Sequence, residues 1–129
     1  MLDPKTAYSG FAVDDVQKAK EFYEGTLGLT ASFVDRGQQL LQLELGGGTP
    51  TLVYTKPDYT PATYTVLNFP VSDVERTVDE LTAKGVAFER YDGLDQDDKG
   101  IFEGGEGRGP TIAWFTDPAG NILAVHEIV

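Results

Sequence analysis

The sequence contains one short pattern twice, at residues 11–18 (FAVDDVQK) and 69–76 (FPVSDVER), about half the chain apart. Each copy is typical of a strand that runs directly into a helix. A short oxygen-bearing side chain, Asp14 or Ser72, is followed three residues later by Gln17 or Glu75, which predicts a capping box. A repeat of this length predicts two copies of one module. The ligand site is then expected in the cleft that the two modules build together.

Hydrophobic periodicity predicts the elements of the first module. Alternation places Phe11 and Val13 of the first strand against a helix, and turns Tyr8, Gly10 and Ala12 the other way. The helix is expected to end at a glycine, residue 28. The predicted order is a strand at 7–13, a helix at 15–27 and strands at 29–34, 39–45 and 51–55.

The second module repeats this order, with a strand at 64–71, a helix at 72–84 and strands at 86–91, 111–116 and 122–128. The predicted fold class is α+β, with two tandem βαβββ modules forming a curved mixed sheet around a cleft. We expect one domain over residues 1–129, comprising a first module at about 5–56, a linker at about 57–62 and a second module at about 63–129.

The segment at residues 92–109 holds six acidic residues and six glycines. It offers few side chains that a core could hold, so the sequence predicts a mobile loop. Two interpretations stay open: a solvated insertion, or a lid beside the cleft.

Composition excludes several classes of function. The chain has no cysteine, which rules out disulfides, zinc–thiolate sites, iron–sulfur clusters and thiol nucleophiles, and makes the cytoplasm the expected location. No segment approaches the ~20 apolar residues that span a bilayer. The net charge of −11, without a basic stripe, disfavours binding to nucleic acid or to an anionic membrane.

Two motifs resemble those of a known family. The run VDDV at 13–16 leads into FYEGTLGL at 22–29, and DPAGN follows at 117–121. Together they are similar to the strand–helix junction and the C-terminal hairpin of the vicinal oxygen chelate superfamily, which includes glyoxalase I, bleomycin-resistance proteins and extradiol dioxygenases. The resemblance spans nearly the whole chain and implies the duplicated βαβββ fold.

In the metalloenzymes of that superfamily, each module supplies a metal ligand from its first strand and another from its last. By the resemblance these positions fall on Tyr8 and Val66, on Ala124 and near Val53. A catalytic divalent metal needs about three imidazole, carboxylate or thiolate donors. We therefore expect no metal and no cofactor.

His126 is the only histidine and lies two residues after Ala124, on the same face of the expected strand. Three roles stay open: a histidine satisfied within the strand, a displaced metal ligand, or a hydrogen-bonding or proton-transfer group facing a ligand. The second role needs carboxylate partners, yet alternation turns Glu44 and Glu127 away from it.

The sequence gives only weak support for serine hydrolysis, phosphate binding or catalysis by paired carboxylates. Ser9, Ser32 and Ser72 do not lie in a nucleophile elbow, so a serine hydrolase is disfavoured. The glycine-rich run at 104–109 is followed by a strand rather than a helix, which disfavours a phosphate loop. Paired carboxylates in the acidic loop would be held poorly by a flexible segment.

With the hairpin loop at 117–121, Trp114 lies opposite Ala124 and Ile112 lies opposite His126, so these side chains share a face. The same alignment assigns Leu41, Leu43, Val53 and Thr55 to that face in the first module. The predicted cleft is apolar and aromatic. Its predicted ligand-binding residues are Tyr8, Val53, Asn68, Trp114, Ala124 and His126, and no catalytic residue is assigned.

These observations favour a metal-free, glyoxalase- or bleomycin-resistance-like protein that binds or sequesters a small hydrophobic or aromatic molecule between the modules. The alternative is a lyase, isomerase or dioxygenase with an atypical metal site or proton transfer by His126. A third possibility is a structural or regulatory interaction module. The resemblance also implies a homodimer.

Overall fold

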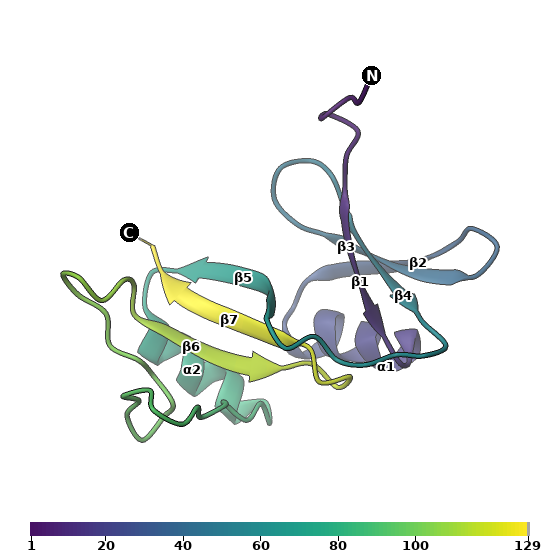
Figure 1. Ribbon diagram of the computed structural model, residues 1–129. Coiled ribbons are helices and arrows are strands. Elements are labelled where there is room, and N and C mark those ends of the chain that lie inside the picture. The colour runs from purple at the N-terminus through teal and green to yellow at the C-terminus, as the bar shows by residue number, and fades with distance from the viewer. Residues whose placement is uncertain (129) are drawn as a thin grey trace. The chain divides into compact units, whose positions relative to one another are not determined.

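The computed structural model describes residues 1–128 and divides into two compact units, Met1–Pro61 and Ala62–Val129. Each unit carries one β-sheet with helical structure packed on it (Figure 1). The boundary falls at the second proline of the predicted linker. That both units form a single domain stays a prediction.

The first unit has the predicted βαβββ order. It consists of β1 (Ser9–Val13), α1 (Val16–Lys20), η1 (Glu21–Thr26), β2 (Thr30–Asp35), β3 (Gln39–Glu44) and β4 (Thr51–Thr55). The strands form a sheet in the order β1-β4-β3-β2, with β1 parallel to β4 and the other neighbours antiparallel.

The second unit consists of β5 (Thr65–Val71), α2 (Val74–Ala83), β6 (Ile112–Thr116) and β7 (Ile122–Glu127), with strand order β5-β7-β6. The strand predicted at 86–91 is reduced to an isolated bridge between Phe88 and Phe115. Beyond that bridge the Gln96 side chain takes the place of a neighbouring strand, since it accepts from the Tyr91 N–H at 2.8 Å and donates to the Glu89 carbonyl at 2.9 Å. The α+β class is confirmed, with sheets of four and three strands.

Both helices begin one residue later than the capping boxes predicted. The Asp15 carboxylate accepts from the backbone N–H groups of Gln17 and Lys18, and the Asp73 carboxylate accepts from Arg76 N–H at 3.1 Å. The backbones of Asp15 and Asp73 are extended, as is typical of N-cap residues. An aspartate at this position accepts hydrogen bonds from first-turn amides that have no partner within the helix. The predicted caps Asp14 and Ser72 therefore lie outside the helices.

The first helix widens after α1 into the π-helical segment η1 and ends where Gly28 adopts a φ of 74°. Wider turns of this kind occur where packing or function favours them over the α form. Here the segment places Tyr23 in the core, fully buried and edge-to-face with Phe11 at a ring-centroid distance of 6.0 Å.

The DPAGN turn between β6 and β7 is a buried polar network. The Asp117 carboxylate accepts from the backbone of Ala119 at 3.0 Å and of Asn121 at 2.8 Å, and also from the Asn121 side-chain amide. The Asn121 side-chain oxygen accepts from Ala62 N–H. Asp117 and Asn121 are 4% and 2% exposed, so the motif fixes the hairpin and the start of the second unit.

The acidic segment 92–109 is held more firmly than the sequence predicts. Gln96 bonds three backbone groups, and the Arg90 guanidinium donates to the carbonyls of Gln96 and Asp97. The Asp97 carboxylate accepts from the amides of Lys99 and Ile101, and Lys99 reaches Glu75 and Asp79 of α2. Acidic and basic side chains of this segment thus hold its backbone in place. The expectation of a segment with little to anchor it is therefore wrong.

Residues 1–128 include no helix both long and apolar enough to cross a membrane.

Candidate ligand-binding face

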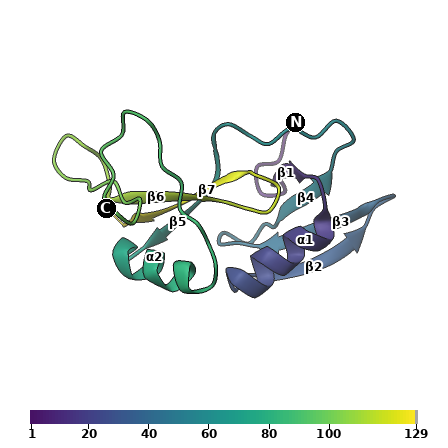
Figure 2. The same ribbon diagram turned by 90° about the horizontal axis from the view of Figure 1, so that it is seen from below.

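Helix α2 packs on β6 and β7 and covers one face of the second sheet (Figures 1 and 2). The side chains on that face are buried: Ala113, Phe115 and Leu123 are 0% exposed, and Val125 is 3% exposed. Because side chains alternate along a strand, the intervening residues project from the opposite face. We call this opposite surface the helix-free face of the second sheet.

Opposed residue pairs from β6 and β7 line the helix-free face. Trp114 lies opposite Ala124, as the sequence predicts from the turn position. The pairings of Ala124 and His126 continue across to neighbouring residues of β5. The pairs are Ile112 with His126, Trp114 with Ala124 and Thr116 with Ile122, while Asn68 lies beside Ala124 and Pro70 beside His126. The structure thus brings four predicted residues, Asn68, Trp114, Ala124 and His126, onto one face.

These four residues differ in accessibility. Asn68 is exposed and Trp114 and His126 are half-buried, so all three can contact a molecule on this face. Ala124 is 0% exposed, which makes it part of the floor rather than a contact.

The Trp114 indole meets the Tyr91 ring edge-to-face, with centroids 5.5 Å apart and planes at 76°. Such a pair forms a corner of two apolar surfaces whose ring faces also carry negative quadrupole charge. Partial burial raises the pKa of the Tyr91 phenol, and the negative charge of Glu89 raises it further. The protonated phenol is therefore the form that this site favours.

The His126 ring bonds the backbone of the next residue, with Nδ1 3.0 Å from the Glu127 carbonyl oxygen. Because a carbonyl oxygen only accepts, Nδ1 carries a proton in this contact. In the neutral imidazole, Nε2 is then a free acceptor. Glu127 points to the other face, where its carboxylate accepts from the first amide of α2, Val74 N–H, at 3.1 Å.

Two predicted residues belong to the first unit. Tyr8 precedes β1 and is 56% exposed. Val53 is fully buried and pairs with Phe11 and Leu41, on the face that packs against α1 and η1. The expectation that Val53, Leu41 and Leu43 line the cleft face is therefore wrong.

The parallel pairings give the reason for this error. Phe11 of β1 pairs with Val53, and its repeat counterpart Phe69 of β5 pairs with Val125. Val53 is thus equivalent to Val125, and the residue equivalent to Ala124 is Leu52. A shift of one residue turns a strand side chain to the opposite face.

The corrected positions offer no metal donor set. The side chains of Leu52, Ala124 and Val66 are hydrocarbons. The strand neighbours of His126 are Ile112 and Pro70, which cannot bind a metal either. Within residues 1–128 no three His, Cys, Asp or Glu side chains cluster as metal ligands do. The residues present do not fit a catalytic divalent metal of the kind that the superfamily uses.

A hollow of about 390 Å³ lies on the other side of segment 86–100. Lys99 and Asp79, which both line it, are already paired with each other at 2.9 Å. Its lining residues are Asp79, Thr82, Val86, Ala87, Phe88, Arg90, Asp98, Lys99 and Gly100. The helix-free face, with its aromatic pair, is the better candidate for an organic ligand.

Sequence reasoning missed three residues of this face: Glu89, Tyr91 and Phe102. Glu89 N–H donates to the Trp114 carbonyl at 2.8 Å, and Phe102 exchanges two backbone hydrogen bonds with Ile112. Alternation in the predicted strand at 86–91 was a usable signal for Glu89 and Tyr91. Phe102 lay in a segment interpreted as a loop, where no periodicity pointed to a face.

Comparison with known proteins decides the family. The sequence profile of the Glyoxalase/Bleomycin resistance protein/Dioxygenase superfamily matches residues 6–125. The chain belongs to this superfamily. A search of curated protein sequences gave no significant match.

Solved structures of other proteins share the fold. TnmS3, an antibiotic binding protein from Streptomyces sp. CB03234, superposes with a TM-score of 0.70 at 24% identity over 100% of this chain and 99% of that one. A superfamily member from Sphaerobacter thermophilus DSM 20745 gives 0.68 at 24% identity, covering 95% and 96%. A glyoxalase family protein from Enterococcus faecalis gives 0.64 at 22% identity, covering 97% of each.

Proposed function

We propose that this superfamily member binds or sequesters a small hydrophobic or aromatic molecule, without a metal or cofactor, at a site that includes the helix-free face of the second sheet. The observation that carries the proposal is the half-buried Trp114, set edge-to-face against Tyr91 on a face that also carries Ala124, Ile112 and a few polar side chains. Aromatic corners of this kind hold planar apolar ligands.

Further support comes from the structural neighbour TnmS3, which is an antibiotic binding protein with the same fold. Under this proposal Asn68 and His126 orient the ligand by hydrogen bonds, and Ala124 forms the floor. We also propose that the protein acts in the cytoplasm as a homodimer, in keeping with its lack of cysteine and with its family.

The test is calorimetric titration with the neutral probe 1-naphthalenemethanol. Trp114→Ala removes the larger ring and is expected to weaken binding about tenfold or more, whereas Trp114→Phe keeps an aromatic surface and loses less. Thermal unfolding of both variants checks that the fold persists. Equal affinity of the wild-type protein and Trp114→Ala, with both folded, would contradict the proposal.

A second candidate function is proton transfer by His126, favoured by the contact that leaves Nε2 free as an acceptor. A lyase or isomerase of this kind changes its substrate, so mass spectrometry or NMR of a bound molecule distinguishes it from a binding protein. His126→Gln retains a hydrogen-bonding side chain but cannot shuttle a proton at neutral pH. Loss of turnover with retained binding in this variant would support the enzymatic alternative.

A further inference from the structure

We propose that the molecule bound on the helix-free face is an organic cation, an aromatic compound bearing a protonated amine, whose ring packs on Trp114 and whose ammonium pairs with Glu89. This inference rests on the proposed function and specifies its ligand class.

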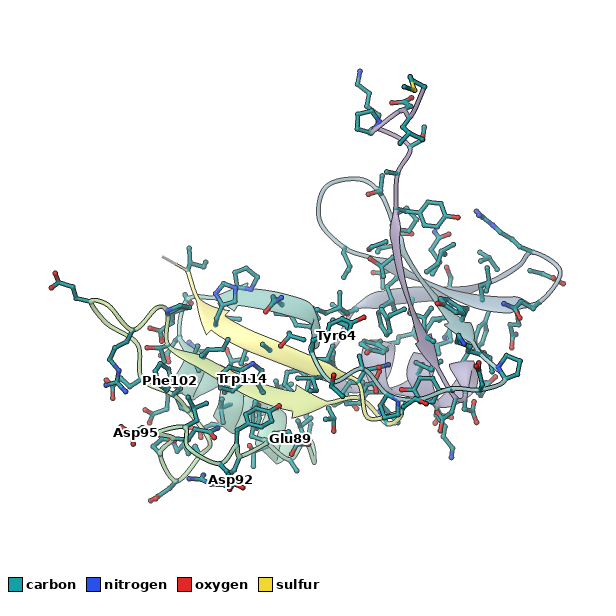
Figure 3. The ribbon with its side chains drawn as sticks, in the orientation of Figure 1. Tyr64, Glu89, Asp92, Asp95, Phe102 and Trp114 are labelled. Atoms are coloured by element: carbon teal, nitrogen blue, oxygen red, sulfur yellow. The ribbon has the colours of Figure 1, made fainter. Side chains whose placement is uncertain are left out.

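Backbone pairing places Glu89 beside Trp114. Phe88 bridges to Phe115, and their rings meet on the α2 side at a centroid distance of 5.4 Å. The next residue therefore projects to the opposite face, next to the strand position of Trp114. The hydrogen bond from Glu89 N–H to the Trp114 carbonyl, 2.8 Å long, fixes the two residues side by side (Figure 3).

Within residues 1–128, no cationic side chain pairs with the Glu89 carboxylate. It is half-buried, and across residues 1–128 it takes part in no hydrogen bond or ion pair. The neighbouring Arg90 is turned away, with its guanidinium held by the carbonyls of Asp97 and Gln96. A carboxylate without a partner beside an aromatic pair favours a ligand that supplies a positive charge.

The same face already holds one cation in the arrangement that we propose. Phe102 continues the row of Ile112 and His126, and the Arg108 guanidinium lies over its ring, 4.8 Å from the centroid. Asp95 completes the group, with a carboxylate oxygen 3.6 Å from Arg108 Nη2. Ring, cation and carboxylate thus stand together, within the protein, beside the proposed site.

A second group of ring and carboxylate is formed by Trp114 with Tyr91 and by Glu89. In this group we assign the position of the cation to the ligand. Tryptophan is the strongest of the aromatic side chains in attracting a cation, and its edge-to-face packing on Tyr91 presents a second ring at the corner. Asp92 adds negative charge to the segment that follows Glu89 (Figure 3). The protein's net charge of −11 draws cations toward it and repels anions.

The experiment compares three probes that share one ring system: 1-naphthylmethylamine, protonated at neutral pH, neutral 1-naphthalenemethanol, and anionic 1-naphthoate. Calorimetric titration of the full chain is expected to give the tightest binding for the amine, about tenfold tighter than for the alcohol, with the carboxylate weakest. The preference for the amine should shrink as salt is added.

Glu89→Gln should abolish the preference, so that this variant binds the amine no more tightly than the alcohol. Glu80→Gln is the matched control, because it removes the same charge from α2, which covers the other face, and disrupts only an exposed pair with Arg76. The control should behave as the wild type does.

The outcomes separate the two proposals. Failure of all three probes to bind would sink the proposed function. Equal binding of the three, a preference for the carboxylate, or an amine preference that survives Glu89→Gln would overturn the ligand class and leave the binding function standing.

Discussion

The Asp117 carboxylate is joined to Asn121 by two hydrogen bonds, one from its backbone N–H at 2.8 Å and one from its side-chain amide at 3.2 Å, inside a turn that excludes water. Asp117→Ala removes these bonds and strands buried amide groups, so we expect unfolding to become easier by about 2–4 kcal/mol. Urea denaturation measures the change. Asp117→Asn keeps one acceptor oxygen and should lose less; an unchanged midpoint in both variants would contradict this account of the turn.

The caps of the two helices give a paired prediction. Asp15→Ala and Asp73→Ala should each destabilise the protein by about 1 kcal/mol, because their carboxylates accept from the first-turn amides. Asp14→Ala and Ser72→Ala, one residue earlier, should stay within about 0.5 kcal/mol of the wild type. Denaturation of the four variants under one condition compares them directly, and the reverse ranking would restore the capping boxes that the sequence predicts.

Two glycines should respond oppositely to alanine. At Gly104 an added Cβ would lie 2.3 Å from the Gly109 carbonyl oxygen, which is backbone and cannot move aside, so Gly104→Ala should cost about 1–3 kcal/mol. At Gly25, inside η1, the added methyl meets no atom within 4 Å, and φ is not positive. Gly25→Ala should stabilise by about 0.5–1 kcal/mol. Thermal unfolding reports both, and destabilisation by Gly25→Ala would argue that η1 needs glycine for another reason.

Tyr91 should make stability depend on alkaline pH. Burial and, secondly, the charge of Glu89 hold its pKa above the ordinary value of 10.0 in the folded state. As the pH rises, the unfolded chain therefore releases this proton before the folded protein does. The contribution of Tyr91 to the free energy of unfolding is fully present below pH 10 and is lost as the pH rises through the pKa of the folded state. In Glu89→Gln the pKa should fall toward its ordinary value.

The measurement is a tyrosinate absorbance titration of the wild type minus Tyr91→Phe, because the chain contains five other tyrosines. An identical difference curve in Glu89→Gln would show that Glu89 does not act on this ring.

The faces of the second sheet were predictable because one local feature fixes them. The DPAGN turn sets which residues of β6 and β7 lie opposite each other, and the register of Trp114 with Ala124 follows from counting outward. In the first unit the same count failed at Val53, since a different, glycine-rich loop joins β3 to β4. The alignment that holds in both units is the parallel pairing of Phe11 and Phe69 with the last strands.

The place of Glu89 beside Trp114, and the order of segment 92–109, were not readable from the sequence. Glu89 meets Trp114 through a pairing between distant parts of the chain, which local periodicity does not specify. Segment 92–109 has the composition of a disordered loop, and its order comes from specific bonds made by Gln96 and Asp97. Composition averages over such bonds and therefore misses them.

The edge of β6 is covered by a segment that is attached mainly through backbone atoms and Gln96. The side chains of Glu89, Tyr91 and Phe102 make none of these hydrogen bonds. Substitutions at these three positions change the chemistry of the face and remove no backbone hydrogen bond. Under the proposed function, ligand preference and stability therefore depend on different atoms of this segment. Under that proposal, related sequences can differ in ligand while keeping the same backbone pairing.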